Sequence, residues 1–200
     1  MTTPRDLLIV TMDVASGRPV EQGDLSLALA GAELVDLVDA EALTLDGDRI
    51  VPGPPSAVAD RLLHDAASSL SRQAPYESVE EWLWRRGRGL SSTYLADLEA
   101  EGQVTRQRHR WIPLRTDGTA LVDSPARRQA AARWTSGEPV LAALAAATGI
   151  HEPTEDPLRL SDDTIVTVLA AVNNAVMELE AVRQRRSIED AAFDNIWRGP

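Results

Sequence analysis

The residues that could do chemistry in this chain are arginines, concentrated around the stretch RQRHRWIPLRTDGTALVD at 106–123. The chain has no lysine and a formal net charge of -11, yet the window 85–134 holds ten arginines against five acidic residues. A guanidinium group binds phosphate through two parallel hydrogen bonds. This local excess of guanidinium groups therefore indicates a surface for phosphates or other anions.

Side-chain alternation along an extended strand sorts the basic residues of this stretch onto two faces. Residues two apart share a face of a strand. Arg106, Arg108 and Arg110 then lie on one face together with Ile112 and Leu114, whereas Trp111 and Arg115 lie on the other.

The tryptophan and the arginines have more than one explanation. Trp111 near the tip suits a lipid headgroup boundary or a stacked base, and Trp111, Ile112 and Leu114 together would make an interfacial anchor. A non-functional alternative is an edge strand whose charges only block aggregation. A second basic group, Arg85, Arg86 and Arg88 in WRRGRG, precedes the stretch and completes the set of expected anion-binding residues.

Residues typical of catalysis are scarce. The chain has no cysteine, and its three histidines, His64, His109 and His151, lie far apart without a ligand-spaced partner. Gly87-Arg88-Gly89 lacks the strand and the Lys-Ser/Thr pair of a phosphate-binding loop. We therefore expect no enzymatic activity, no metal and no cofactor.

The elements that must position these arginines are mostly helices. Apolar residues recur at helical spacing in several segments, while Asp46-Gly47 and Asp117-Gly118 are hairpin-turn signals between short extended runs. The expected fold is mainly α: a single globular helical domain over 1–200 with two short β-hairpins, at 42–51 and 104–122. The second hairpin is expected to project and to be rich in arginine.

Helix boundaries follow from capping residues. Asp24 and Ser56 are expected to cap the second and third helices, and Ser-Val-Glu-Glu at 78–81 has the spacing of a capping box. The last helix is expected to span 162–185. Of two tryptophans on one helix, Trp82 and Trp84, one should be buried and the other partly exposed, because residues two apart cannot share a helix face.

Location is expected from composition. The N-terminal stretch has no signal-peptide pattern, and no run approaches about 18 uninterrupted apolar residues. We expect a cytoplasmic protein, with at most peripheral contact at the inner face of a membrane.

A DNA-binding alternative also fits part of the pattern. Helix, glycine and basic hairpin is the order of a winged-helix protein, in which the helix before the wing enters the major groove. Here that helix carries Asp97, Glu99 and Glu101, which would repel phosphates. Nucleic acid is therefore not the expected partner.

Six segments together resemble one known family. They are LLIVTMDVASG, LALAGAELVDLVDAEALTLDGDRIV, LLHDAASSL, ESVEEWLWRRG, YLADLEAEGQVTRQRHRWIPL and TIVTVLAAVNNAVMELE. In order and in hairpin placement they resemble the Golgi phosphoprotein 3 family, which has bacterial members beside eukaryotic lipid-binding adaptors. The arginine-rich, lysine-free composition suggests a bacterial source.

The resemblance implies a non-enzymatic adaptor that binds phosphatidylinositol phosphate headgroups at a membrane. The family's four pocket positions, a Trp and three Arg, correspond to Glu21, Ala30, Arg88 and Ser91, of which only Arg88 matches. This implies attraction to an anionic phospholipid surface more than recognition of one lipid. The family hairpin also implies membrane contact or assembly into a homo-oligomer, and no protein cargo is indicated.

Overall fold

The computed structural model describes residues 2–14, 20–54, 58–107, 118–151 and 162–197. Within these residues the chain forms eight helices and two hairpins, which confirms the expected mainly α fold. The helices are α1 (Thr3–Val14), α2 (Gln22–Asp39), α3 (Arg61–Ser68), α4 (Val79–Arg86), α5 (Leu90–Ala100), α6 (Pro125–Thr135), α7 (Pro139–Ala147) and α8 (Asp163–Trp197). The strands are β1 (Leu43–Asp46), β2 (Arg49–Pro52), β3 (Val104–Gln107) and β4 (Gly118–Leu121).

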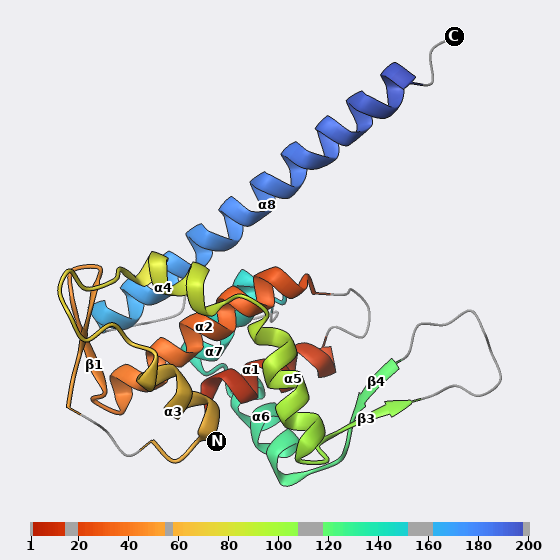
Figure 1. The fold of residues 1–200 in the computed structure, drawn as a ribbon. Helices are drawn as coiled ribbons and strands as arrows, with labels where there is room; N and C mark the ends of the chain where they lie inside the picture. The colour runs from red at the N-terminus through yellow and green to blue at the C-terminus, as the bar shows by residue number, and fades with distance from the viewer. Residues whose placement is uncertain (1, 15–19, 55–57, 108–117, 152–161, 198–200) are drawn as a thin grey trace.

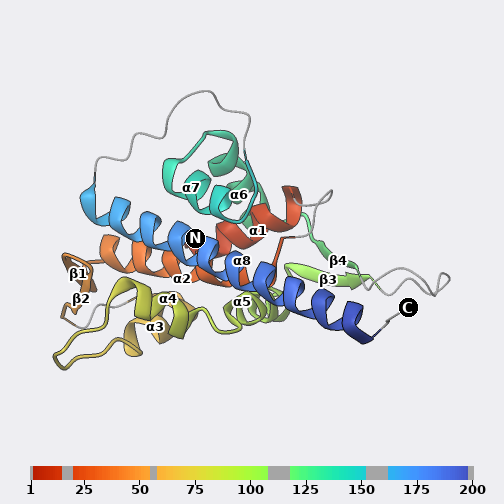
Figure 2. The ribbon, with the colours of Figure 1, turned by 90° about the horizontal axis from the view of Figure 1, so that it is seen from above.

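Helix α2 lies at the centre of the molecule (Figure 1). It is buried almost continuously from Leu25 to Leu37, as expected of a helix that is apolar on most of its faces. The helix packs against α1, α3, α4, α5, α7 and α8. Figure 2 shows α6 and α7 on one side of the α2–α8 pair and α3, α4 and α5 on the other.

Close packing joins α2 to two of its neighbours. The Trp82 indole is completely buried and donates to the carbonyl of Ala30 over 3.1 Å. Gly31 faces Val172 of α8, and a Cβ at Gly31 would lie 2.3 Å from Val172 Cγ2. The absence of a side chain at Gly31 thus lets α2 and α8 approach.

Both hairpins are present, and the second differs from the expected one. In the first, Asp46 pairs with Arg49 around a Gly47-Asp48 loop, with Gly47 at φ 62°. In the second, Gly118 is a ladder residue that pairs with Gln107. The predicted turn at Asp117-Gly118 is therefore wrong, because Gly118 already belongs to the paired strand; residues 108–117 lie outside the described part of the chain.

Capping was predicted correctly at one helix and incorrectly at two. Ser78 and Glu81 form the complete capping box of α4. Helix α2 begins before Asp24, which pairs with Arg183 instead of capping. Asp60 caps α3 by accepting from the Leu63 N–H over 3.1 Å, so the cap predicted at Ser56, outside the described residues, is wrong.

Helix α8 is longer than the sequence periodicity indicates. It runs to Trp197 instead of ending at 185, and its C-terminal half extends beyond the other helices (Figure 1). Over Asp163–Asp190 it is also long and apolar enough to cross a membrane, with a window of mean hydropathy 1.5. In this fold its apolar residues Ile165, Val168 and Val172 are buried against the domain, and 28% of that window is buried.

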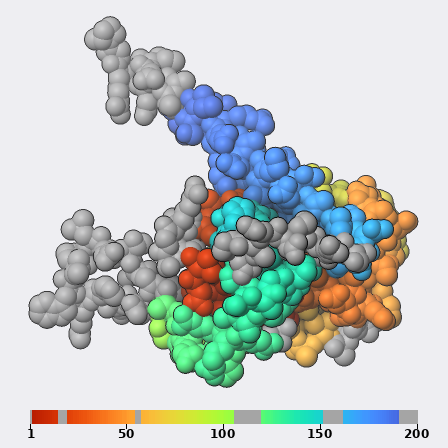
Figure 3. Space-filling model, turned by 180° about the vertical axis from the view of Figure 1, so that it is seen from behind, coloured from red at the N-terminus to blue at the C-terminus, as the bar shows by residue number. Residues whose placement is uncertain are grey.

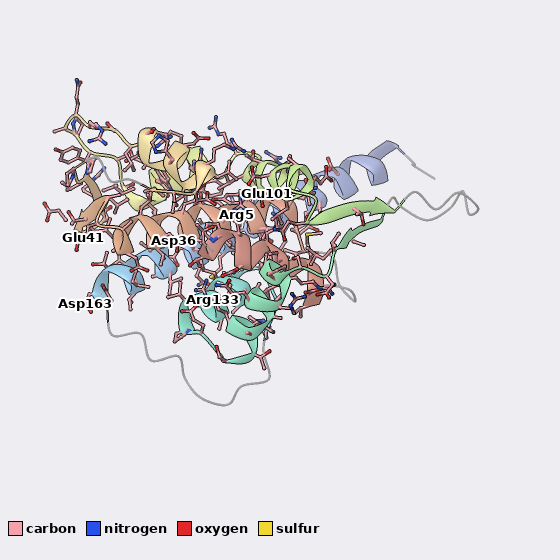
Figure 4. The ribbon with its side chains drawn as sticks, turned by 90° about the horizontal axis from the view of Figure 1, so that it is seen from below. Arg5, Asp36, Glu41, Glu101, Arg133 and Asp163 are labelled. Atoms are coloured by element: carbon pink, nitrogen blue, oxygen red, sulfur yellow. The ribbon has the colours of Figure 1, made fainter. Side chains whose placement is uncertain are left out.

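Ion pairs tie α1 to distant segments. Figure 4 shows Arg5 beside Glu101. The Arg5 side chain pairs with Asp60 over 2.8 Å and with Glu101 over 2.6 Å, and it also contacts Asp97. Arg61 contacts Asp97 as well, over 2.5 Å. Asp97 and Glu101, which were expected to repel DNA, are therefore paired with arginines within the protein.

Candidate anion-binding site

The turn between α4 and α5 positions the basic group at 85–88. Helix α4 ends because Gly87 closes it, with the Gly87 N–H donating to the Leu83 carbonyl over 2.9 Å. Gly89 has φ 69°, a left-handed conformation that glycine adopts without steric cost. Arg88 lies between these glycines and is exposed.

The other two arginines of the group are held by partners inside the protein. Arg86 binds Glu33, which is completely buried, through two hydrogen bonds of 2.8 Å each. Tyr94 donates to the same carboxylate over 3.0 Å. Burial and the nearby carboxylate raise the pKa of the Tyr94 hydroxyl, which therefore stays a neutral donor. Arg86 thus neutralises a buried charge.

Arg85 is also engaged, although it lies nearer the surface. Its guanidinium pairs with Glu77 over 2.7 Å and lies 5.0 Å from the centre of the Trp82 ring. It also donates to the Ser69 carbonyl over 3.3 Å. Arg88, in contrast, has no hydrogen bond or ion pair to any part of the chain that the structure describes.

A shallow hollow of about 320 Å³ opens beside Arg88. Its walls come from the first two turns of α2, the end of α4 with the α4–α5 turn, the first turn of α5, and α8. Its lining residues are Gln22, Gly23, Ser26, Leu27, Trp84, Gly87, Arg88, Gly89, Ser91, Ser92 and Leu179.

Serine hydroxyls join two walls of the hollow. Ser26 Oγ donates to Ser91 Oγ over 2.9 Å, and the Ser91 N–H donates to Ser26 Oγ over 3.1 Å. The start of α5 is thereby locked onto α2. The next residue, Ser92, is exposed, and its N–H and hydroxyl have no partner among the described residues.

The hollow therefore offers several groups suited to an anion. They are the unpaired guanidinium of Arg88, the free hydroxyl and N–H of Ser92, and the positive end of the α5 dipole. Trp84 is half-buried beside them, which confirms that one tryptophan of the pair is buried and the other partly exposed. Sequence reasoning missed Ser26, Trp84 and Ser92, although a Ser-Ser pair after Gly-Arg-Gly is a recognisable helix start.

The four positions matched to the family's pocket do not stay together. Arg88 and Ser91 line the hollow, whereas Ala30 is completely buried in α2. Glu21 lines a different and larger groove of about 910 Å³ between the ends of α1, α2 and α7 and the middle of α8. The fold thus brings two of the four positions to one site.

The hairpin residues predicted to bind anions or a membrane can be placed only in part. Arg106 lies in β3, which pairs with β4 through Thr119. The remaining predicted residues fall outside the described part of the chain: Arg108, Arg110, Trp111, Ile112, Leu114 and Arg115. Their assigned roles stay predictions.

Metal binding has no support in the described residues. No group of three or more histidine and acidic side chains that could hold a metal ion occurs there. His64 and His151 are both exposed and lie on different segments.

The described residues form a mainly α-helical domain around a buried central helix, with a short arginine-bearing turn at its surface. The family model Golgi phosphoprotein 3 (GPP34) matches residues 4–188, and the chain belongs to this family. No curated protein matches the chain.

Proposed function

We propose that this protein is a non-enzymatic, peripheral membrane adaptor that binds anionic phospholipid headgroups. The hollow beside Arg88 holds a headgroup phosphate, with Arg88 as its cationic ligand. The arginine-rich hairpin adds a second, less selective contact with the membrane surface.

One observation carries this proposal: Arg88 alone among Arg85, Arg86 and Arg88 has no partner among the described residues. An exposed guanidinium between two glycines can approach a phosphate without steric hindrance from neighbouring side chains. The engaged arginines, by contrast, would have to give up Glu77 or the buried Glu33 before they bound a ligand. Arg88 is therefore the residue of this group available to a ligand.

The backbone beside Arg88 strengthens the site. The free N–H and hydroxyl of Ser92 lie in the first turn of α5, where the helix dipole favours negative charge. Because Ser91 is held by Ser26, this turn is ordered before any ligand arrives. Such preorganisation lowers the entropy lost on binding.

Selectivity for one lipid is expected to be low. A single free arginine supplies the charge in the hollow, and Asp24 in the first turn of α2 is already paired with Arg183. Each basic residue near an anionic membrane contributes about 1 kcal/mol. In this proposal, surface charge governs binding to the membrane, and the hollow orients the protein on it.

Vesicle co-sedimentation of the full chain tests this function. Wild-type protein should bind vesicles containing anionic lipid, with phosphatidylinositol phosphate included in one series, and should bind neutral vesicles weakly. Arg88→Ala should weaken binding about fivefold, the equivalent of roughly 1 kcal/mol. Arg128→Ala is the matched control, because Arg128 is an exposed arginine of α6 that pairs with exposed Asp123 just before that helix.

Two results would count against this function. One is equal binding of neutral and anionic vesicles. The other is tight, sequence-dependent binding of duplex DNA in a parallel arm, which would restore the winged-helix alternative. If Arg88→Ala and Arg128→Ala weaken binding equally, anionic membranes are still bound but the hollow is not the site.

A further inference from the structure

The C-terminal half of α8 extends away from the rest of the domain. Among the described side chains of this helix, the last buried one is Val176, and every one from Gln184 to Asp190 is exposed. The helical backbone nevertheless continues to Trp197. Figures 1 and 3 show this half of α8 standing clear of the body from two opposite sides.

The attachment of α8 to the domain ends at one ion pair. Arg183 binds both carboxylate oxygens of Asp24, over 2.8 and 3.1 Å. Beyond it, the described side chains make a single hydrogen bond, from Gln184 to Glu180 on the same helix. Most helical stability in proteins comes from tertiary packing, so this half of α8 lacks its usual support.

The projecting half carries charges in two blocks of opposite sign. Arg185 and Arg186 come first, and Glu189 and Asp190 follow four residues later. All four side chains are exposed, and none has a hydrogen bond or ion pair to the described residues. An arginine that precedes its acid by four residues is the less favourable order for pairing within one helix. These charges are therefore available to another molecule.

We propose that the projecting half of α8 pairs antiparallel with the same segment of a second copy of this chain. In antiparallel order, with the crossing between Ser187 and Ile188, Arg185 and Arg186 of each copy lie beside Asp190 and Glu189 of the other. A parallel arrangement would set like charges against each other. The contact is a two-fold symmetric interface in which one patch meets itself.

Two exposed apolar residues of α8, eleven positions apart, lie on one face of the helix beside the charged patch. Ile188 is 68% exposed and lies at the crossing. In this register, the end of α8 at position 197 in one copy lies opposite position 178 of α8 in the other copy. Met177, which is 62% exposed, lines the groove of about 910 Å³ beside that point.

Charge reversal on the full chain tests the interface by sedimentation equilibrium. Wild-type protein should form dimers that weaken as salt rises. The variant Arg185→Glu/Arg186→Glu is acidic at all four positions, and Glu189→Arg/Asp190→Arg is basic at all four. Each should dimerise at least about tenfold more weakly than the wild type, because like charges then meet across the interface. An equimolar mixture of the two variants should recover dimers.

A third variant and two controls complete the test. The variant with all four charges exchanged should dimerise like the wild type. Arg72→Glu, which changes an exposed arginine on the α3–α4 connection, should have no effect, and circular dichroism should show unchanged helicity in every variant. Trp111→Ala should also leave the dimer intact.

Three outcomes would overturn the proposal. They are a wild-type chain that stays monomeric at every concentration, a mixture of the two variants that stays monomeric, and dissociation by Trp111→Ala alone. The last result would assign assembly to the hairpin.

Discussion

At the scale of single residues, the neighbouring arginines at 85, 86 and 88 have different tasks. Arg86 is directed inward and neutralises Glu33, Arg85 pairs at the surface with Glu77, and Arg88 has no partner among the residues that the structure describes. Sequence spacing alone groups all three as anion-binding residues. Their different positions around α4 and its terminal turn separate them.

The Glu33–Arg86 pair leads to a stability prediction. Arg86→Met leaves a buried carboxylate without its cation, and Glu33→Gln leaves the guanidinium without its anion. Each single change should lower the free energy of unfolding by about 3–5 kcal/mol, as expected when one partner of a buried pair is removed. The double variant should lose clearly less than the sum, which urea denaturation can measure in a double-mutant cycle.

Arg85→Ala is the control for this cycle. Its pair with Glu77 is partly exposed, and such pairs contribute about 0–1 kcal/mol. If the two single changes at Glu33 and Arg86 proved additive, the pair would not act as a unit, and the structural role assigned to Arg86 would be wrong.

At the scale of elements, the crossing of α2 and α8 depends on a glycine. Gly31→Ala would place a Cβ 2.3 Å from Val172 Cγ2. Overpacking of this kind costs about 1–3 kcal/mol, and the better helix propensity of alanine offsets up to about 1 kcal/mol of that. We expect a net loss of stability, seen as a lower thermal midpoint.

A second glycine of α2 provides the comparison. A Cβ at Gly23 would meet the ends of the Leu179 and Arg183 side chains, at 2.7 and 2.8 Å. These long side chains can move aside, so Gly23→Ala should cost less than Gly31→Ala. Adding Val172→Ala to Gly31→Ala should relieve the clash. If the double variant loses as much stability as the two single changes added together, a steric cause is excluded.

At the scale of the whole molecule, the distribution of charge decides which kinds of surface the protein can bind. The net charge of -11 disfavours indiscriminate contact with anions. Many of the basic groups that the structure describes are paired with acids, including Arg5, Arg86, Arg127, Arg133 and Arg183. The proposed attraction to a membrane therefore depends on arginines outside these pairs, among which the proposal assigns the role to Arg88 and to the hairpin.

The hairpin prediction concerns the association of the whole protein with membranes. Replacing Arg106, Arg108 and Arg110 by serine should remove roughly 3 kcal/mol of attraction to anionic vesicles, about a hundredfold in affinity. Trp111→Ala should also weaken binding, but with nearly unchanged salt dependence, because it removes an interfacial aromatic group and no charge. Vesicle co-sedimentation at two salt concentrations distinguishes these effects.

The same two variants can show that the hairpin has another role. Intact vesicle binding after the triple arginine change, together with unfolding or loss of oligomers after Trp111→Ala, would make the hairpin a packing or assembly element. The lipid-anchor role assigned to Trp111 would then be withdrawn.

By itself, the sequence determined the local features of this protein. Helical spacing of apolar residues predicted helices in several segments, and the Ser78 capping box was read correctly. Two hairpins form as expected, although only the first turns at its predicted Asp-Gly signal. These features depend on residues close together in the chain, so their physical causes are visible in a short window. The order of motifs also carried the family resemblance, which the match over 4–188 confirms.

Only the tertiary structure decided which charged residues are available. Arg86 and Arg88 are two positions apart, but Glu33, which binds the first, lies on another helix more than fifty positions away. Likewise, Asp24 became a partner of Arg183 instead of a cap, and α8 continues past the point where its apolar pattern ends. The physical reason is that a charge is neutralised by whatever the fold brings within a few ångströms, which spacing along the chain does not specify.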